Sequence, residues 1–347
     1  MEAGERLSGT PAGLRRALRA DLGSGLADER GVPCAGRAAE HRLLAAAGAR
    51  DLAWGRLYEG HVNALQLIGR LGSPAQRAAA ASDVAHGRLF GVWNTEAHEG
   101  VRIARADADE VELVGRKTFA SGAGRVARAL ITAQWPDGGR QLTLVPMDRA
   151  PAVVDRSFWN DPLGMEASDS FAVDFTDVRV GRSGVIGEPG AYEASPWFTG
   201  GASRFVAVQA GGVTALVRAL AGFLRRRGFG DAALQTARLG ESVVAARTAA
   251  LWVEACVAAW ERFDEDPVAE RAADLLTTVD AARAAVERAA LDVMERVERA
   301  VGARGLLGSE PFARRIRDLR MYLRQPAIDA VVARVAQAAL IETDASN

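Results

Sequence analysis

Residues 115–122 read Gly-Arg-Lys-Thr-Phe-Ala-Ser-Gly and contain the single lysine of the chain, Lys117. The segment has the composition of a short strand that ends in a turn at Ser121-Gly122. Residues two apart in a strand share a face, so Phe119 and Ser121 are expected to meet one planar ligand together. By the same rule Lys117 is expected on the face that carries Phe119.

On both sides of this segment the apolar residues follow the pattern of short strands. Turn signals such as Pro136-Asp137-Gly138-Gly139 separate four such runs, at 111–114, 129–133, 142–145 and 171–175. Short strands at this spacing predict an antiparallel, barrel-like β domain over residues 86–190.

The regions before and after the predicted β domain are expected to be helical. Residues 1–85 carry apolar residues at intervals near three and four, and Ser73 and Pro74 are typical of a helix start. Residues 195–347 contain four long segments nearly free of internal Gly and Pro, which predict a four-helix bundle: 203–227, 232–263, 267–301 and 311–341. Pro326 falls at a possible break in the last of them. The predicted fold class is α+β and mainly α.

Composition narrows the class of protein. The chain has 347 residues, of which 49% are hydrophobic and 25% charged, so it can bury a large core. Its 43 basic and 44 acidic residues nearly cancel, which argues against nucleic-acid binding. All basic residues except Lys117 are arginine, a bias typical of a GC-rich bacterial genome.

Targeting and metal signals are weak. Cys34 and Cys256 are the two cysteines, and they form no C-x-x-C pair, so neither a disulfide scaffold nor a metal site is predicted. The first ten residues lack the apolar region of a secretory signal. Since no uncharged apolar run reaches about 18 residues, we expect no membrane span and a cytoplasmic protein.

Four further motifs stand in a fixed order along the chain. Residues 87–96 read Gly-Arg-Leu-Phe-Gly-Val-Trp-Asn-Thr-Glu, and residues 163–180 contain a Gly-Met turn, a small polar stretch and a closing strand. Residues 226–235 begin Arg-Arg-Gly-Phe-Gly and end in Gln. Residues 301–318 begin Val-Gly-Ala-Arg-Gly, continue to Ser-Glu-Pro and end in Arg-Asp.

Taken with residues 115–122 and the domain order, these motifs resemble the acyl-CoA dehydrogenase family of flavoproteins over nearly the whole chain. Members have an N-terminal helical domain, a middle β domain and a C-terminal four-helix bundle. The resemblance implies a bound FAD shared across subunits, and therefore a homodimer or homotetramer. Domain boundaries are expected at 1–85, 86–190 and 195–347.

In the β domain the resemblance implies flavin contacts from two strands. The aromatic ring of Phe119 would pack on the flavin, and the Ser121 hydroxyl would hydrogen-bond near its reactive nitrogen. The backbone of the first strand would lie along the ring through Trp93, Asn94 and Thr95.

The loop after Glu96 departs from the family, which has proline where this chain has Ala97 and a longer loop than His98-Glu99-Gly100. The resemblance is therefore weakest on the acyl-thioester side. Ser168 and Ser170 are expected to cap turns, with a ligand contact as the alternative.

In the bundle the resemblance implies contacts to the phosphates. Arg226 would reach the FAD of a neighbouring subunit, where a guanidinium suits a pyrophosphate, with Gln235 nearby. The alternative is a solvated arginine at a helix C-terminus. The loop that holds Gly302, Arg304 and Gly305 would approach a phosphate closely.

The catalytic base is displaced from the family positions. Dehydrogenation needs a carboxylate within hydrogen-bond reach of the proton alpha to the thioester. The two family positions for it hold Ser309 and Ser203. Glu310 is the candidate base, one residue away, or alternatively a first-turn carboxylate beside Pro311 at the start of a helix.

Three classes of function follow. The first is an FAD-dependent α,β-dehydrogenase of an acyl-CoA or acyl-carrier-bound thioester, with hydride transfer to flavin and an electron-transfer flavoprotein as a further partner. The second is a flavin-dependent monooxygenase on the same fold, supplied by a flavin reductase. The third is a catalytically degenerate homologue that acts as a binding protein.

Overall fold

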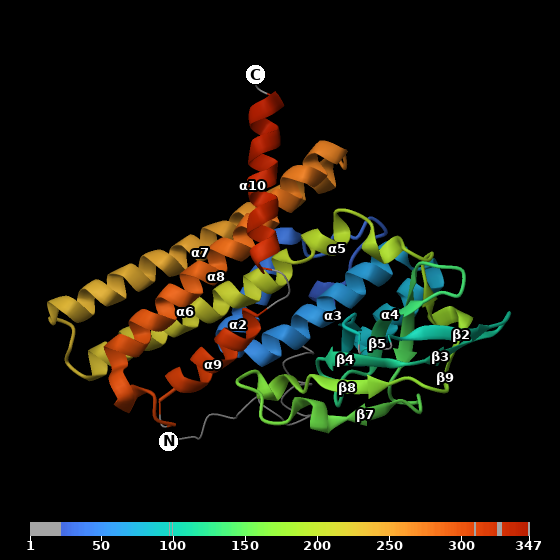
Figure 1. Ribbon diagram of the computed structural model, residues 1–347, viewed down its shortest axis with the longest axis horizontal. Coiled ribbons are helices and arrows are strands. Elements are labelled where there is room, and N and C mark those ends of the chain that lie inside the picture. Colours follow the sequence, from blue (N-terminus) through green and yellow to red (C-terminus); the bar gives the residue numbers. More distant parts are fainter. Residues whose placement is uncertain (1–21, 97, 99, 309, 325–327, 346–347) are drawn as a thin grey trace. The chain divides into compact units, whose positions relative to one another are not determined.

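The structure is a computed structural model that describes residues 22–96, 98, 100–308, 310–324 and 328–345. The chain divides into two compact units (Figure 1). The first comprises residues up to 40, residues 56–162 and residues 166–194. The second comprises residues 41–55, residues 163–165 and the chain from residue 195 onward. Helices α2 (Arg37–Arg50) and α3 (Leu52–Leu71) each supply residues to both units.

The first unit is built on two sheets. The larger has strand order β10-β6-β5-β2-β3-β9, with β1 also paired to β5. Its strands are β1 (Phe90–Trp93), β2 (Arg102–Ala106), β3 (Glu110–Val114), β5 (Arg128–Gln134), β6 (Arg140–Pro146), β9 (Val178–Gly181) and β10 (Val185–Ile186). The smaller sheet has order β4-β8-β7, from β4 (Arg116–Ala120), β8 (Phe171–Asp174) and β7 (Val153–Asp155).

The four predicted strands are confirmed as β3, β5, β6 and β8. Most strand pairs of the β domain are antiparallel, as expected, but β1 and β2 both pair with β5 in parallel. Strand β5 is antiparallel to β6 on one edge and meets two short parallel strands on the other, so the sheet is mixed.

Short helical elements close the first unit. Besides helix α4 (Pro74–Ala85) they are the 3-10 turns η1 (Leu22–Gly25), η2 (Arg156–Trp159), η3 (Glu166–Ser168), η4 (Arg182–Gly184) and η5 (Ala191–Glu193). The predicted start of α4 is confirmed. Ser73 caps the helix, its hydroxyl accepts from the backbone N–H of Gln76, and the Gln76 side chain accepts from the Ser73 N–H.

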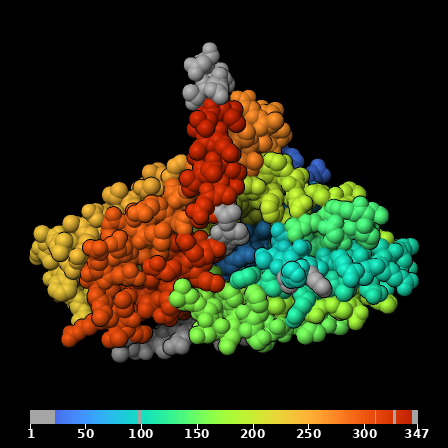
Figure 2. All heavy atoms as spheres, viewed as in Figure 1, coloured from blue at the N-terminus to red at the C-terminus, as the bar shows by residue number. Residues whose placement is uncertain are grey.

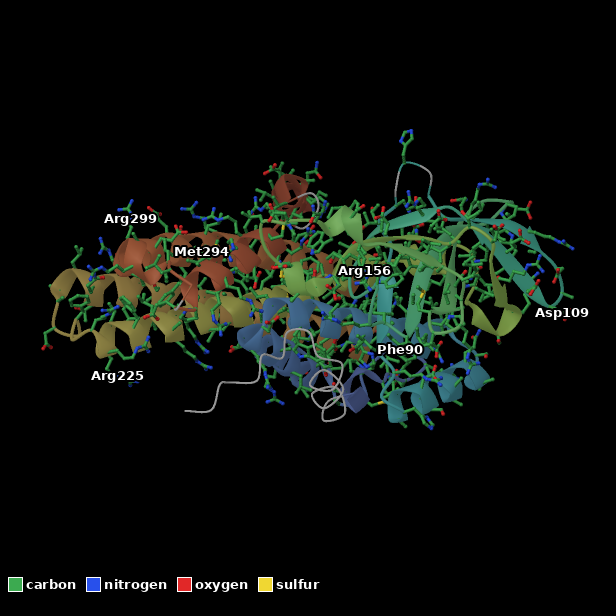
Figure 3. The ribbon with its side chains drawn as sticks, turned by 90° about the horizontal axis from the view of Figure 1, so that it is seen from below. Phe90, Asp109, Arg156, Arg225, Met294 and Arg299 are labelled. Carbon is green, nitrogen blue, oxygen red and sulfur yellow. The ribbon has the colours of Figure 1, made fainter. Side chains whose placement is uncertain are left out.

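The second unit is a helical bundle. Helices α6 (Ser203–Arg226), α7 (Ala233–Glu265) and α8 (Ala269–Gly305) pack around a core that includes Trp260, Phe263 and Val286, with the short α5 (Trp197–Gly200) beside it. Arg225 and Arg299 point outward from these helices (Figure 3), whereas Arg204 of α6 is buried.

The prediction of one continuous fourth helix over residues 311–341 is wrong. The segment forms two helices, α9 (Phe312–Tyr322) and α10 (Ile328–Ala345), and Pro326 between them lies outside the described residues. The break between the two helices falls where the sequence holds a proline, a residue type that disfavours a continuous helix. Helix α10 projects from the bundle surface (Figure 2) and is held to α8 by a two-point ion pair between Arg334 and Asp280, at 2.6 and 3.0 Å.

Two helical stretches are long and apolar enough to cross a membrane when judged by length and composition only: 197–226 and α7. Core helices of globular proteins satisfy the same criterion, and the first stretch is mostly buried in the bundle. The expectation of no membrane span therefore stays a prediction.

Candidate flavin-binding site

Phe119 occupies an irregularity in strand β4. The register of β4 on β8 shifts between Lys117 and Ala120, and Phe119 has a φ of 50°, a value that non-glycine residues rarely adopt. Phe119 is 47% exposed, whereas Lys117 is fully buried. The expectation that the two share a face is therefore wrong, because an irregularity of this kind resets the alternation of side chains along a strand.

The buried end of Lys117 is held by a polar network. Its Nζ donates to Glu96 Oε1 at 3.0 Å and to Thr132 Oγ1 at 2.9 Å. The Thr132 hydroxyl donates in turn to Asn94 Oδ1 at 2.8 Å. Arg140 Nη2 lies 3.1 Å from the same Glu96 oxygen. The network thus fixes the residues that follow β1, and β1 is the strand that the family resemblance places along the flavin.

Charges in this network perturb one another. Burial lowers the pKa of Lys117 to about 8, and Arg140 acts in the same direction, against the opposing effect of the Glu96 carboxylate. Burial alone would raise the pKa of Glu96, but hydrogen bonds and charge from Lys117 and Arg140 outweigh it and hold that pKa below its ordinary value. Glu96 is therefore a carboxylate at neutral pH.

Two aromatic residues of η2 accompany Phe119. The rings of Phe158 and Trp159 meet the Phe119 ring edge to face, with centroid separations of 5.0 and 6.0 Å. The carboxylate of Asp155 holds η2 by accepting from the backbone N–H of Ser157 at 3.0 Å. The indole N–H of Trp159 is buried and has no hydrogen-bond partner among the residues that the structure describes. The sequence-based interpretation missed this cluster.

The other predicted flavin contacts in this unit differ in accessibility. The Trp93 side chain is buried, and its indole N–H donates to the Ser121 carbonyl at 3.0 Å, so this side chain is not available to a ligand. Asn94 is engaged by the network around Lys117. Thr95 is exposed and Ser121 is half-buried. Phe119, Thr95 and Ser121 therefore offer the accessible side chains.

Two predicted site residues of the bundle pair with each other. Arg226, at the end of α6, places its Nη2 3.3 Å from Oε2 of Glu310. Most of the Glu310 side chain is buried, whereas more than half of the Arg226 side chain is exposed. The candidate base and the candidate phosphate ligand therefore partly neutralise one another.

The remaining bundle candidates surround the end of α8. Gly302 interrupts that helix with a φ of 59°, and Arg304 is exposed. A Cβ on Gly305 would lie 2.3 Å from the Cβ of Val301, so close packing alone requires a glycine there. Gln235 donates to the Ala300 carbonyl at 3.4 Å, and its buried Oε1 has no partner within the described part of the chain.

Neither family position for the base offers a carboxylate. Ser309 lies outside the described residues. Ser203 is buried in the bundle core, where its Oγ accepts from the indole N–H of Trp260 at 3.0 Å and lies 3.1 Å from Nε2 of His41. The Ser203 hydroxyl is therefore engaged in hydrogen bonds inside the bundle. In the sequence, Glu310 is the carboxylate closest to a family position for the base.

The Gly-Met turn has a structural role. The Asp318 carboxylate accepts from the backbone N–H of Met165 at 2.6 Å. A Cβ on Gly164 would lie 2.2 Å from the carbonyl oxygen of Arg317, so the turn can approach α9 only with glycine at this position.

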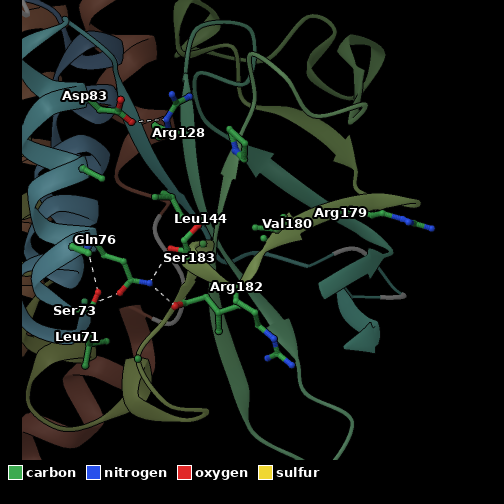
Figure 4. A pocket seen from close by; sticks show the side chains of 18 of the residues that line it. Leu71, Ser73, Gln76, Asp83, Arg128, Leu144, Arg179, Val180, Arg182 and Ser183 are labelled. Atoms are coloured by element: carbon green, nitrogen blue, oxygen red, sulfur yellow. Dashed lines mark hydrogen bonds and ion pairs between the residues drawn. The ribbon is translucent and has the colours of Figure 1, made fainter. Parts of the chain in front are cut away.

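A separate hollow of about 940 Å³ lies in the first unit, between α4 and the larger sheet (Figure 4). Gln76 crosses it to donate to the carbonyls of Ser183 and Val185 at 2.9 and 2.7 Å. Arg128 at its wall is paired with Asp83 at 2.6 Å. These groups bind each other and hold α4 to the sheet. Among the described residues, no group of three or more His, Cys, Asp or Glu could hold a metal ion.

The chain has the fold of acyl-CoA dehydrogenase-like flavoproteins, as comparison with solved structures shows. Methanesulfinate monooxygenase MsuC from Pseudomonas fluorescens matches with a TM-score of 0.80 and 20% identity, over 96% of this chain and 91% of that one. TdsC from Paenibacillus sp. A11-2, in complex with FMN and indole, matches with a TM-score of 0.75 and 22% identity, over 96% of both chains.

One curated relative is similar in sequence. It is the amino sugar nitrososynthase DnmZ of Streptomyces peucetius, 28% identical over 230 residues, which is 63% of this chain. The match spans just over half, 56%, of the length of that relative. No protein-family model matches the chain.

Proposed function

We propose that this chain is an enzyme, a flavin-dependent monooxygenase that oxidises a small molecule. The observation that carries the proposal is the combination of this fold with the loss of a free carboxylate at the positions where a dehydrogenase keeps its base. A dehydrogenase must remove a proton alpha to a carbonyl, whereas an oxygenation does not need that base.

The first unit suits an isoalloxazine ring. Phe119 presents an exposed aromatic side chain, Ser121 is half-buried two residues further on, and Thr95 is exposed just after β1. Reduced flavin and molecular oxygen, when bound, supply one oxygen atom to the substrate and release the other as water with two hydrogens from the flavin. The residues of this chain would hold the ring, exclude water from its face and orient the substrate.

The contacts of Glu310 argue against the alternative that the protein is a dehydrogenase. Its carboxylate lies 3.3 Å from Arg226, and this ion pair restrains the side chain. A general base must reach its proton, so Glu310 could act only after leaving Arg226.

The substrate is proposed to carry an oxidisable nucleophilic atom, with the nitrogen of an amine as the first candidate. The support is that the curated relative is named an amino sugar nitrososynthase, while one solved neighbour is named a monooxygenase of a sulfur compound. An amine nitrogen and a sulfinate sulfur each carry a lone pair that can attack an electrophilic oxygen.

The flavin is proposed to be FMN, which the TdsC structure contains, rather than FAD. Arg226, the residue that would serve an FAD pyrophosphate in a neighbouring subunit, is instead paired with Glu310. We further propose a homodimer or homotetramer. Exposed apolar residues along α7, among them Val243, Val244 and Leu251, support an association through the bundle.

Three measurements test the function. The purified protein should bind added FMN, seen as a shifted flavin absorbance band, and chromatography of the released flavin distinguishes FMN from FAD. With NADH, a flavin reductase and oxygen, the protein should oxidise the primary amino group of an amino-sugar nucleotide. Anaerobic acyl-CoA should leave bound flavin coloured.

Each class of function has its own outcome. Bleaching by an acyl-CoA that Glu310→Gln abolishes would establish a dehydrogenase and overturn the proposal. Failure to bind any flavin would instead favour a binding protein.

A further inference from the structure

Three serine hydroxyls form a hydrogen-bonded chain in the first unit. Ser168 ends η3, Ser170 precedes β8, and Ser121 follows β4. The Ser168 and Ser170 oxygens are 2.7 Å apart, and the Ser170 and Ser121 oxygens are 2.9 Å apart. Ser168 and Ser170 are buried, at 1% and 4% exposure, whereas Ser121 is half-buried and lies two residues after Phe119 in the sequence. The serine chain therefore runs from the interior to the half-buried residue that the family resemblance places near the flavin. The Ser168 and Ser170 hydroxyls were expected to cap turns, and here they bind each other.

The backbone around the three serines fixes their separation. The N–H of Gly122 donates to the Ser168 carbonyl at 2.7 Å, which ties the turn after β4 to η3. The Trp93 indole N–H binds the Ser121 carbonyl from the other side. Arg125 holds the stretch between Ser168 and Ser170 through Asp169, at 2.7 Å. Each hydroxyl can rotate its proton, but the oxygens stay in place.

A count of protons decides which serine hydroxyl donates to which. The three hydroxyls have three protons but make only two hydrogen bonds with one another, so one proton is left over. The hydroxyls of Ser168 and Ser170 have no other hydrogen-bond partner among the described residues, and a buried donor without an acceptor is unfavourable. The leftover proton avoids this cost only on Ser121, which requires Ser170 to donate to Ser121. Ser121 then has its own proton to offer outward.

We propose that Ser170 makes Ser121 a hydrogen-bond donor toward the ligand and so favours a ligand atom that carries a lone pair. The inference rests on the proposed function, in which the ligand is a flavin. The N5 atom of oxidised flavin is an acceptor, whereas reduced flavin carries a hydrogen there. Ser170 is thus a positioning residue that raises the affinity for oxidised flavin relative to reduced flavin, and Ser168 strengthens it by donating to Ser170.

The test measures the dissociation constants of oxidised and anaerobically reduced FMN with the full chain. Ser170→Ala should lower the preference for oxidised FMN at least threefold, because a neutral hydrogen bond is worth a few-fold in affinity. A threefold change in this ratio equals a rise of about 14 mV in the midpoint potential of the bound two-electron couple. Ser168→Ala is the matched control, because Ser170 still has no acceptor except Ser121, and it should change the ratio less than twofold.

The outcomes separate this inference from the proposed function. An unchanged ratio in Ser170→Ala, with FMN still bound, overturns the inference and leaves the proposed function standing. No FMN binding by the unmodified protein removes both. If Ser170→Ala does not fold, Ser121→Ala replaces it, since Ser121 is the half-buried end of the row of three serines. This variant must lower the preference for oxidised FMN at least threefold, and an unchanged preference also overturns the inference.

Discussion

Because Lys117 is the one lysine of the chain, its pKa can be measured without overlap from other lysines. Lys117 is fully buried, and its Nζ has Glu96, Thr132 and the nearby charge of Arg140 as its polar surroundings. Burial penalises the ammonium form, so we predict that Lys117 loses its proton near pH 8 instead of near its ordinary value of 10.5.

The sign and size of the effect on stability follow from this shift. Between about pH 8 and 10.5 the unfolded chain keeps a proton that the folded chain has lost, so raising the pH through this window stabilises the fold. The shift corresponds to roughly 3 kcal/mol in total, and roughly 1 kcal/mol of it is gained between pH 7 and pH 9. In Lys117→Met this increment is absent.

Selective ¹³C labelling of lysine gives one side-chain resonance, since the chain has one lysine. Its chemical shift, followed from pH 6 to 11, should titrate with a midpoint near 8. Urea denaturation of the unmodified protein and of Lys117→Met at pH 7 and pH 9 gives the second readout. The difference between the two proteins cancels the titration of all other groups.

A midpoint near 10.5 would refute the reasoning, because it would mean that Glu96 compensates the burial of the ammonium completely. A normal midpoint together with equal pH dependence of the two proteins would show that Lys117 reaches water. Addition of FMN should leave the midpoint within about one unit, as Lys117 faces the interior and not the exposed side of β4.

Other substitutions test the remaining geometry. Lys117→Arg should lower the melting temperature and weaken FMN binding, because a planar guanidinium does not fit a fully enclosed ammonium site; unchanged values of both would contradict this. Phe119→Ala should weaken FMN binding about tenfold with under about 1 kcal/mol lost in stability, since its ring is half exposed, whereas the buried Phe175→Ala should cost about 3–5 kcal/mol. Gly164→Ala should destabilise the fold by about 2 kcal/mol through the contact of its Cβ with the Arg317 carbonyl, and a neutral melting temperature would disprove that contact.

Local patterns account for how well the elements were predicted. The strands and the helices α6, α7 and α8 fall where the apolar period changes between two and 3.6, because burial of one face is a property of neighbouring residues. Ser73 predicts the start of α4 for the same reason, since capping is completed within three residues by Gln76. The parallel pairing of β1 with β5 had no such signal, because it joins residues almost forty positions apart.

The candidate site was predicted by residue type but not by arrangement. Phe119 is exposed and Ser121 is half-buried, yet the register shift that exposes Phe119 and buries Lys117 depends on how β4 pairs with β8. The pairing of Arg226 with Glu310 likewise joins residues that are 84 positions apart.

The sequence by itself determined the order of helices, strands and helices, the balance of charge and the position of a lone lysine. The tertiary structure decided what the polar residues do. It buries Lys117 against Glu96 and Thr132, encloses Ser203 between His41 and Trp260, and aligns three serines from separate segments. The physical reason is that burial of an apolar face is encoded in a local period, whereas the partner of a buried polar group is set by which distant segments the fold brings into contact.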